Sequence, residues 1–185
     1  MPAKFWNSEK LLSISAILIS LATLFTVIYQ ANLMRKRQYA SVLPYLELWQ
    51  SRINGETFGL SLVNNGLGPA FVKRVQVIYQ DKAYPGDLHD FLYSDIVLKE
   101  DSIKKLFYSN LLPGRLIPPG GTVELLKVEG SARDFQILKK WISSRNVQLE
   151  VIYSSVYEEF WSLKGIGDAP TSCRSVAKCG TPLPP

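Results

Sequence analysis

The chain is poor in the residue types on which most enzyme chemistry depends. Its 185 residues include one histidine, His89, and two cysteines, Cys173 and Cys179. General-base catalysis usually needs a histidine with organised partners, and a structural zinc site needs a closed set of ligands. His89 lies in a polar segment, 87–90, that is typical of a surface turn. We therefore expect no catalytic residue, no metal and no cofactor, and predict a protein that is not an enzyme.

Acidic residues leave one enzymatic alternative open. A pair of carboxylates can hydrolyse a glycosidic bond without the help of a histidine. We interpret the acidic residues in the middle of the chain as scattered surface groups instead: they are Asp81, Asp87, Asp90, Asp95, Glu100 and Asp101.

The globular part of the chain has no excess of either charge. The formal net charge is +5, yet the 14 basic and 14 acidic side chains between Tyr45 and Gly165 balance. The excess comes from seven basic and two acidic residues outside that range. Proteins that bind nucleic acids normally carry a basic face that replaces the counterions of the phosphates. A neutral domain of mixed charge argues against a nucleic-acid partner.

No charged residue occurs in 11–34, which is a long apolar run. As a helix, residues 11–31 would be about 31 Å long, which matches the roughly 30 Å hydrocarbon core of a bilayer. A cleaved signal peptide would be shorter and would end in a small-residue cleavage site, and a core helix would be amphipathic. We predict a membrane-spanning helix at 11–31, after a short N-terminal segment 1–10 and before a basic juxtamembrane segment 32–44.

The charges on the two flanks predict the orientation of this helix. Three basic residues follow the apolar run: Arg35, Lys36 and Arg37. The N-terminal flank carries Lys4 and Lys10 beside Glu9. Because the more basic flank stays in the cytoplasm, we expect the N-terminus outside, the domain inside, and the three basic side chains among lipid headgroups. A disulfide between Cys173 and Cys179 would fit an oxidising compartment and not the cytosol, so the cysteines test this orientation.

Small residues in the apolar run offer a possible contact between two helices. Ala16 and Ser20 are four residues apart on one helical face. Small residues at this spacing let two helices approach closely, although the pattern is also a common accident in apolar segments. A homodimer through the helix is therefore an open alternative to a monomer.

After Pro44, which cannot continue a helix, apolar and polar residues alternate. Period-two alternation bounded by turn residues is typical of short strands. In one such run we place Phe71, Val75, Val77 and Tyr79 on the same face. About seven short strands in 45–165 predict a mainly β domain, an immunoglobulin-like β-sandwich, with a small barrel as the alternative.

One or two short helices interrupt the strands. Ser131 and Asp134 have the spacing of a capping pair, and the apolar residues that follow share one helical face, beginning with Phe135. A second short helix or turn is expected in 87–96. The segment 166–185 is rich in glycine, proline and serine without an apolar period, and we expect a flexible tail there.

Two short patterns have both a functional and a structural interpretation. The spacing Gly66-x-Gly68 after a strand resembles part of a nucleotide-binding loop, but the third glycine and the helix are missing. We expect a turn with positive φ at glycine instead. Aromatic residues of the last hairpin could form an exposed patch for a partner, although core packing is favoured: they are Tyr153, Tyr157, Phe160 and Trp161.

Several of these segments together carry a family resemblance. The apolar helix is followed by the basic residues, by Ser41-Val42-x-Pro44, and by Asn64-Asn65-Gly66-Leu67-Gly68-Pro69-Ala70. This set resembles an uncharacterised family of bacterial single-pass membrane proteins, with an S-V-x-P juxtamembrane segment and an N-x-G-x-G-P-A motif that opens a β-rich domain. The resemblance covers about residues 10–80. It implies a bacterial inner-membrane location and no particular activity.

Taken together, the sequence predicts a membrane-anchored domain that binds something. We expect a non-enzymatic protein-interaction module at the cytoplasmic membrane face, with the lipid bilayer and an unknown protein as partners. The alternative is a membrane-acting stress or defence effector, in which the helix is the working part and the β domain is the sensor.

Overall fold

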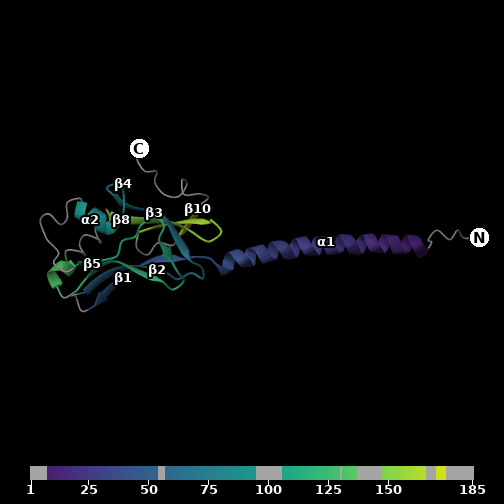
Figure 1. Ribbon diagram of the computed structural model, residues 1–185, viewed down its shortest axis with the longest axis horizontal. Coiled ribbons are helices and arrows are strands. Elements are labelled where there is room, and N and C mark those ends of the chain that lie inside the picture. The colour runs from purple at the N-terminus through teal and green to yellow at the C-terminus, as the bar shows by residue number, and fades with distance from the viewer. Residues whose placement is uncertain are drawn as a thin grey trace, which may run out of the picture. The chain divides into compact units, whose positions relative to one another are not determined.

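The computed structural model describes residues 8–53, 57–94, 106–129, 131–136, 147–165 and 170–173. The chain divides into two compact units, 1–41 and 42–185. The first unit contains the helix α1, Ser8–Ser41, and the second is built mainly from strands (Figure 1).

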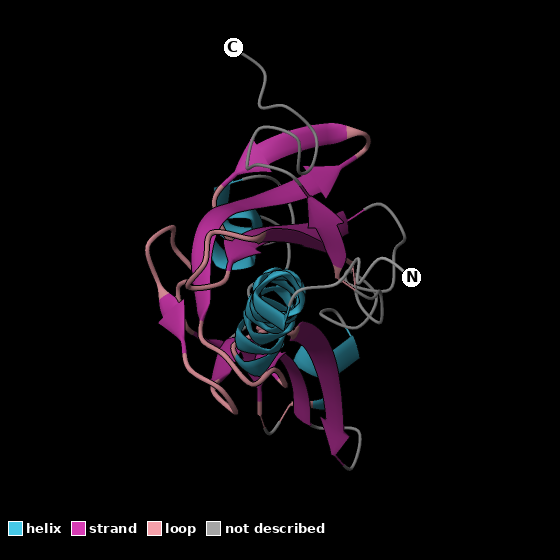
Figure 2. Ribbon diagram, turned by 90° about the vertical axis from the view of Figure 1, so that its right-hand side faces the viewer, coloured by secondary structure: helices cyan, strands magenta, loops and turns pink. Residues whose placement is uncertain are grey.

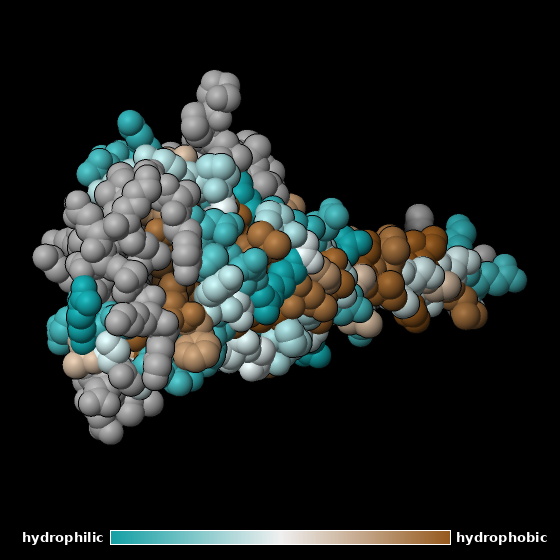
Figure 3. Space-filling model, turned by 60° about the vertical axis from the view of Figure 1, so that its left-hand side comes forward, coloured by the Kyte–Doolittle hydropathy of each residue, from teal (hydrophilic) through white to brown (hydrophobic). Residues whose placement is uncertain are grey.

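Helix α1 has the composition of a segment that crosses a membrane. It is 34 residues long, and none of its residues is buried. Its apolar side chains are therefore exposed, and much of its surface is hydrophobic (Figure 3). Its serine and threonine hydroxyls donate to backbone carbonyls one turn earlier, for example Ser20 to Ala16 at 2.8 Å. These bonds lower the cost of placing hydroxyls in lipid.

The second unit contains two antiparallel sheets (Figure 2). The four-stranded sheet, sheet A, has the order β1-β2-β7-β5. Its strands are β1 (Leu46–Ile53), β2 (Thr57–Asn64), β7 (Thr122–Val128) and β5 (Leu106–Tyr108). The second sheet, sheet B, has the order β10-β9-β8-β3-β4, and β6 also pairs with β3. Its strands are β3 (Ala70–Tyr79), β4 (Lys82–Pro85), β6 (Leu116–Ile117), β8 (Val147–Ser154), β9 (Phe160–Lys164) and β10 (Thr171–Cys173).

One hydrophobic core joins the two sheets. Alternating residues of sheet A, such as Leu60 and Leu62, are buried together with Val75 and Val151 of sheet B. This is the period-two pattern that the sequence shows, and it confirms the prediction of a mainly β domain.

Strand β3 corrects one detail of that pattern. Its pairing with β8 shifts between Val72 and Arg74, so the strand contains a bulge at Lys73. The extra residue reverses the alternation, as a bulge does. Val72, and not Phe71, therefore lies in the core with Val75 and Val77, while Phe71 is only half-buried.

Two helical segments cover parts of the strands. Helix α2, Leu88–Ser94, lies inside the range expected for a short helix. Residues 132–136 are helical, and the amide of Asp134 donates to the Ser131 hydroxyl at 3.1 Å, which confirms the capping pair. Phe135 is buried with its ring edge-on to Phe58. The rest of the expected face (Leu138, Trp141, Ile142) lies outside the described residues.

Strand β10 lies within the segment expected to be a tail. Thr171–Cys173 pairs antiparallel with 160–162 of β9 and extends sheet B by one strand. The remainder of 166–185, apart from residue 170, lies outside the described residues.

Candidate functional site at the junction end of the domain

We call the end of the domain at which the chain enters after α1 the junction end. It is organised around one buried side chain, Asn64. Its Oδ1 accepts hydrogen bonds from the amides of Tyr45 (3.1 Å) and Gly66 (3.0 Å). Its Nδ2 donates to the carbonyl oxygens of Gly68 (2.9 Å) and Ile117 (3.0 Å). An asparagine side chain offers two donors and two acceptor positions, and all four are used. Asn64 therefore joins the start of β1, its own loop and β6.

Two glycines hold the chain that precedes β1. A β-carbon on Gly66 would lie 2.3 Å from the Tyr45 nitrogen, and one on Gly68 would lie 1.9 Å from the Val42 carbonyl oxygen. The amides of Leu67 and Gly68 donate to the carbonyl of Leu43, at 2.9 and 3.2 Å. No side chain fits in either place, since real β-carbons do not approach backbone so closely.

This arrangement corrects the expectation of positive φ at these glycines. The glycines of the described residues with positive φ are Gly86, Gly114, Gly120 and Gly165. Gly66 and Gly68 are required for a different reason: neighbouring backbone passes so close to them that only a residue without a side chain fits. The S-V-x-P and N-x-G-x-G-P-A segments, which carry the family resemblance, thus contact one another.

Exposed apolar side chains gather around this junction end. Leu67 is 73% exposed, slightly more than Phe25 in the apolar helix at 71%. Four other apolar side chains lie on segments that are hydrogen-bonded or paired at the same end of the domain. They are 40–53% exposed: Leu43, Leu116, Val156 and Tyr157. These positions connect because β6 pairs with the start of β3, and Phe71 of β3 lies opposite Ser154 at the end of β8.

The aromatic residues of the last hairpin are divided between core and surface. Tyr153 is buried, and its ring stacks on that of Trp161 with centroids 5.8 Å apart. Its hydroxyl oxygen accepts a hydrogen bond from the amide of Leu46 at 3.3 Å. Burial raises the pKa of Tyr153 well above its ordinary value, and the bond from Leu46 opposes this only in part. Tyr157, by contrast, is exposed at the tip of the hairpin.

A buried carboxylate lies on the other face of sheet B. Glu150 is fully buried between Gln76 and Lys164, which flank it in register on β3 and β9. One carboxylate oxygen accepts from the Gln76 side chain, and the other faces Lys164 Nζ (3.1 Å) and the Ser162 hydroxyl (3.2 Å). Both oxygens are thus occupied by protein groups, which is the arrangement of a structural ion pair.

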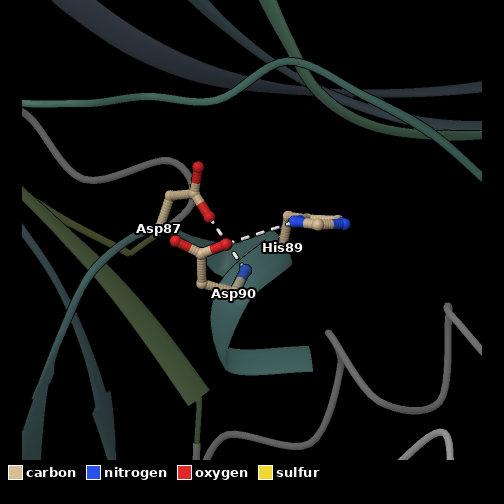
Figure 4. Close-up of side chains that lie close together, drawn as sticks. All are labelled: Asp87, His89 and Asp90. Atoms are coloured by element: carbon tan, nitrogen blue, oxygen red, sulfur yellow. Dashed lines mark hydrogen bonds and ion pairs between the residues drawn. The ribbon is translucent and has the colours of Figure 1, made fainter. Parts of the chain in front are cut away.

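Asp87, His89 and Asp90 form the described group that is nearest to a set of metal ligands. One candidate ligand atom from each lies within 4.8 Å of the others (Figure 4). However, Asp87 already accepts from the amides of Asp90 (2.9 Å) and Leu111 (3.0 Å). Its carboxylate therefore caps α2 and joins it to the segment after β5.

The sequence suggested that His89 lies in a surface turn, but the residue lies in helix α2. Its side chain is 14% exposed, with Nδ1 3.3 Å from an Asp90 oxygen. The ring stacks on Tyr108, with centroids 3.4 Å apart and an interplanar angle of 13°. Of the six acidic residues considered above, Asp95, Glu100 and Asp101 lie outside the described residues.

The residues assigned to the membrane lie on α1. Arg35, Lys36 and Arg37 occupy its last two turns, and Ala16 and Ser20 lie in the apolar part. Ser20 donates its hydroxyl to Ala16 within the same helix, so any helix–helix seam there would depend on small size and not on a hydroxyl contact.

Cys173, at the end of β10, is disulfide-bonded. The other cysteine of the chain, Cys179, lies outside the described residues. A disulfide is typical of an oxidising compartment.

Known proteins add no further assignment to these sites. No protein family model matches the chain, and neither the curated proteins nor the solved structures show a significant similarity to it.

Proposed function

We propose that this chain is a single-pass membrane protein whose β domain binds a protein partner next to the membrane, without enzymatic activity. The observation that carries the proposal is the open edge of sheet A. Strand β1 is eight residues long and, within the part of the chain that the structure describes, pairs on one side only, with β2. Such an edge can accept a strand from another protein.

An exposed tryptophan lies in the middle of this edge strand. Trp49 is 57% exposed, and its indole N–H donates to Glu47 at 3.2 Å. Glu47 also accepts a hydrogen bond from the Asn65 side chain, so the tryptophan is linked through Glu47 to the loop after β2. Large aromatic side chains contribute much of the binding energy at protein interfaces.

The tether supports the same function. The chain passes from α1, which ends at Ser41, directly into residues that the domain holds through Leu43 and Gly68. A partner in the same membrane would therefore meet the domain at a high effective concentration.

The test is crosslinking in membranes, followed by affinity purification and quantitative mass spectrometry. Trp49→Lys places a charge on the β1 edge and should abolish a specific protein adduct. Phe107→Lys is the matched control, because Phe107 is 55% exposed on β5 at the opposite edge of sheet A. Recovery of only lipids and the protein itself with the wild-type chain would reject the proposal.

We further assign the domain to the immunoglobulin-like sandwiches. What supports this is strand order: β1-β2-β7-β5 corresponds to the sheet A-B-E-D of that fold, and β9-β8-β3 corresponds to G-F-C. The core between the sheets agrees with it. An experimental structure with a different strand order would reject the assignment.

For the orientation, the basic residues after the apolar run favour a domain on the cytoplasmic side of the inner membrane. A C-terminal fusion to a phosphatase that folds only outside the cytoplasm should then be inactive. The disulfide at Cys173 favours a second candidate, with the same domain on the outer side. In that case the fusion is active, and Cys173 can be alkylated only after a reductant has opened its disulfide.

A membrane-acting effector with the domain as sensor is the competing function. Exchange of α1 for an unrelated membrane-spanning helix separates the two functions. A binding module tolerates the exchange and keeps its crosslinked partner, whereas an effector loses its activity.

A further inference from the structure

The junction end carries an apolar surface, and it is also the end of the domain at which the chain enters from α1. Its most exposed side chain is Leu67 in the loop after β2, and Val156 and Tyr157 at the tip of the β8–β9 hairpin are about half exposed. Leu116 in β6, 51% exposed, lies between them in the chain of pairings through β3. Loops carry Leu67, Val156 and Tyr157, so these three side chains lie at one end of the sheets.

The hairpin tip is an ordered structure. The hydroxyl of Ser155 accepts hydrogen bonds from the amides of Tyr157 (3.1 Å) and Glu159 (3.4 Å), and the Ser155 amide donates to the Glu159 carbonyl (2.9 Å). Glu158 has a φ of 59° and completes the turn. Val156 and Tyr157 are therefore presented to solvent by a fixed turn, which means that little conformational entropy is lost when they bind.

The length of α1 limits how far this end can lie from the bilayer. Residues 11–31 fill the hydrocarbon core as a helix, and 32–41 of α1 remain beyond it. Ten residues of helix measure about 15 Å, and the headgroup layer on each side is roughly 5–8 Å thick. Val42, which is bonded to Ser41, therefore begins the domain within about 10 Å of the outer boundary of the headgroups.

From this we propose that the loop tips at the junction end, Leu67 with Val156 and Tyr157, insert into the interfacial layer of the bilayer that α1 spans. Apolar and tyrosine side chains are favoured at this depth. The binding is apolar in character, because Leu67 and Val156 are aliphatic side chains and Tyr157 is aromatic. This surface is separate from the β1 edge that we assign to a protein partner.

Photocrosslinking of the full-length chain tests the inference. A benzophenone amino acid replaces Leu67 or Tyr157, and the purified proteins are reconstituted into vesicles of phosphatidylcholine and phosphatidylglycerol. The matched control replaces Phe107, which pairs with Lys127 about 17 Å further along β7 from the junction end. Replacement of Phe25 in α1 reports on the membrane span itself.

After illumination, mass spectrometry should find lipid adducts at positions 25, 67 and 157, each several-fold above the yield at 107. Yields at 67 and 157 no higher than at 107 would overturn the inference while leaving the anchor intact. Adducts between two copies of the chain at these positions, in place of lipid adducts, would also overturn it. A failure at position 25 would reject the membrane span, and both proposals with it.

Discussion

Gly68 lies so close to Val42 that a β-carbon on the glycine would stand 1.9 Å from the valine carbonyl oxygen. The contact joins the loop after β2 to the residues that leave α1. It shows that the segment before β1 is part of the domain's own packing and not a free linker. The stability of the domain should therefore depend on residues that the sequence alone would assign to a turn.

The first prediction concerns this contact. Gly68→Ala should destabilise the domain by about 3 kcal/mol or more, because the new methyl group meets backbone that cannot move without breaking the bonds to Leu43. Thermal and urea unfolding of the full chain in mild detergent measure the change. Leu67→Ala, at the exposed neighbouring position, should leave the midpoint almost unchanged. Equal effects of the two variants would contradict the close approach.

The second prediction concerns Asn64. Its replacement by alanine leaves two partly buried amides and two buried carbonyls without their partner, so Asn64→Ala should cost about 3 to 5 kcal/mol of unfolding free energy. Asn65→Ala removes only an exposed bond to Glu47 and serves as control. Hydrogen exchange should also show faster exchange at the amides of Tyr45 and Gly66 in Asn64→Ala. Unchanged exchange at these two amides would argue against the assigned role.

Alternation of apolar residues allowed most strands to be predicted, because side chains that face a common core repeat every second residue. The bulge at Lys73 could not be predicted in the same way. It adds one residue to β3 without any glycine or proline to mark it, and it moves Phe71 out of the core. The role of Asn64 was equally hidden, since its hydrogen-bond partners lie up to 53 residues away from it in the sequence.

Glu150 shows a further limit of sequence patterns. The alternation in β8 places it correctly on the face opposite Leu149 and Val151, where a charged residue suggests exposure to solvent. The structure buries it completely. Its cross-strand partners are Lys164, which compensates its charge, and Gln76, which donates a hydrogen bond. They are known only once the register of three strands is fixed.

A double-mutant cycle tests this buried ion pair. Lys164→Met leaves the Glu150 carboxylate without its cation and should destabilise the domain by about 2 to 4 kcal/mol. Adding Glu150→Gln should recover part of the loss, because the uncompensated charge is removed. Lys127→Met, which breaks the surface pair with Glu129, should change stability little. Strictly additive effects of the two substitutions would show that the pair is not coupled.

The small residues of α1 make a separate prediction about self-association. If two helices meet at Ala16 and Ser20, Ala16→Leu should reduce dimer yield in membrane crosslinking, whereas Ser20→Ala should preserve it. The difference follows from the Ser20 hydroxyl, which is already bonded to the Ala16 carbonyl within its own helix. Leu18→Ile, on the opposite face of the helix, is the control. Equal dimer yields from all four chains would exclude this seam.

Tyr153 should make the domain sensitive to alkali. Burial raises the pKa of its phenol, so the folded state keeps the proton at pH values where the unfolded chain, with a tyrosine pKa of about 10, has lost it. This contribution to stability is complete below about pH 10 and declines above it, since ionisation then favours the unfolded chain. At neutral pH, Tyr153→Phe should cost about 1 to 2 kcal/mol, because the buried amide of Leu46 loses its acceptor. Above pH 10 the difference in unfolding free energy between wild type and variant should become smaller, since phenylalanine has no proton to lose. Urea unfolding at a series of pH values measures that difference, and a difference that stays constant up to about pH 11 would contradict a raised pKa at Tyr153.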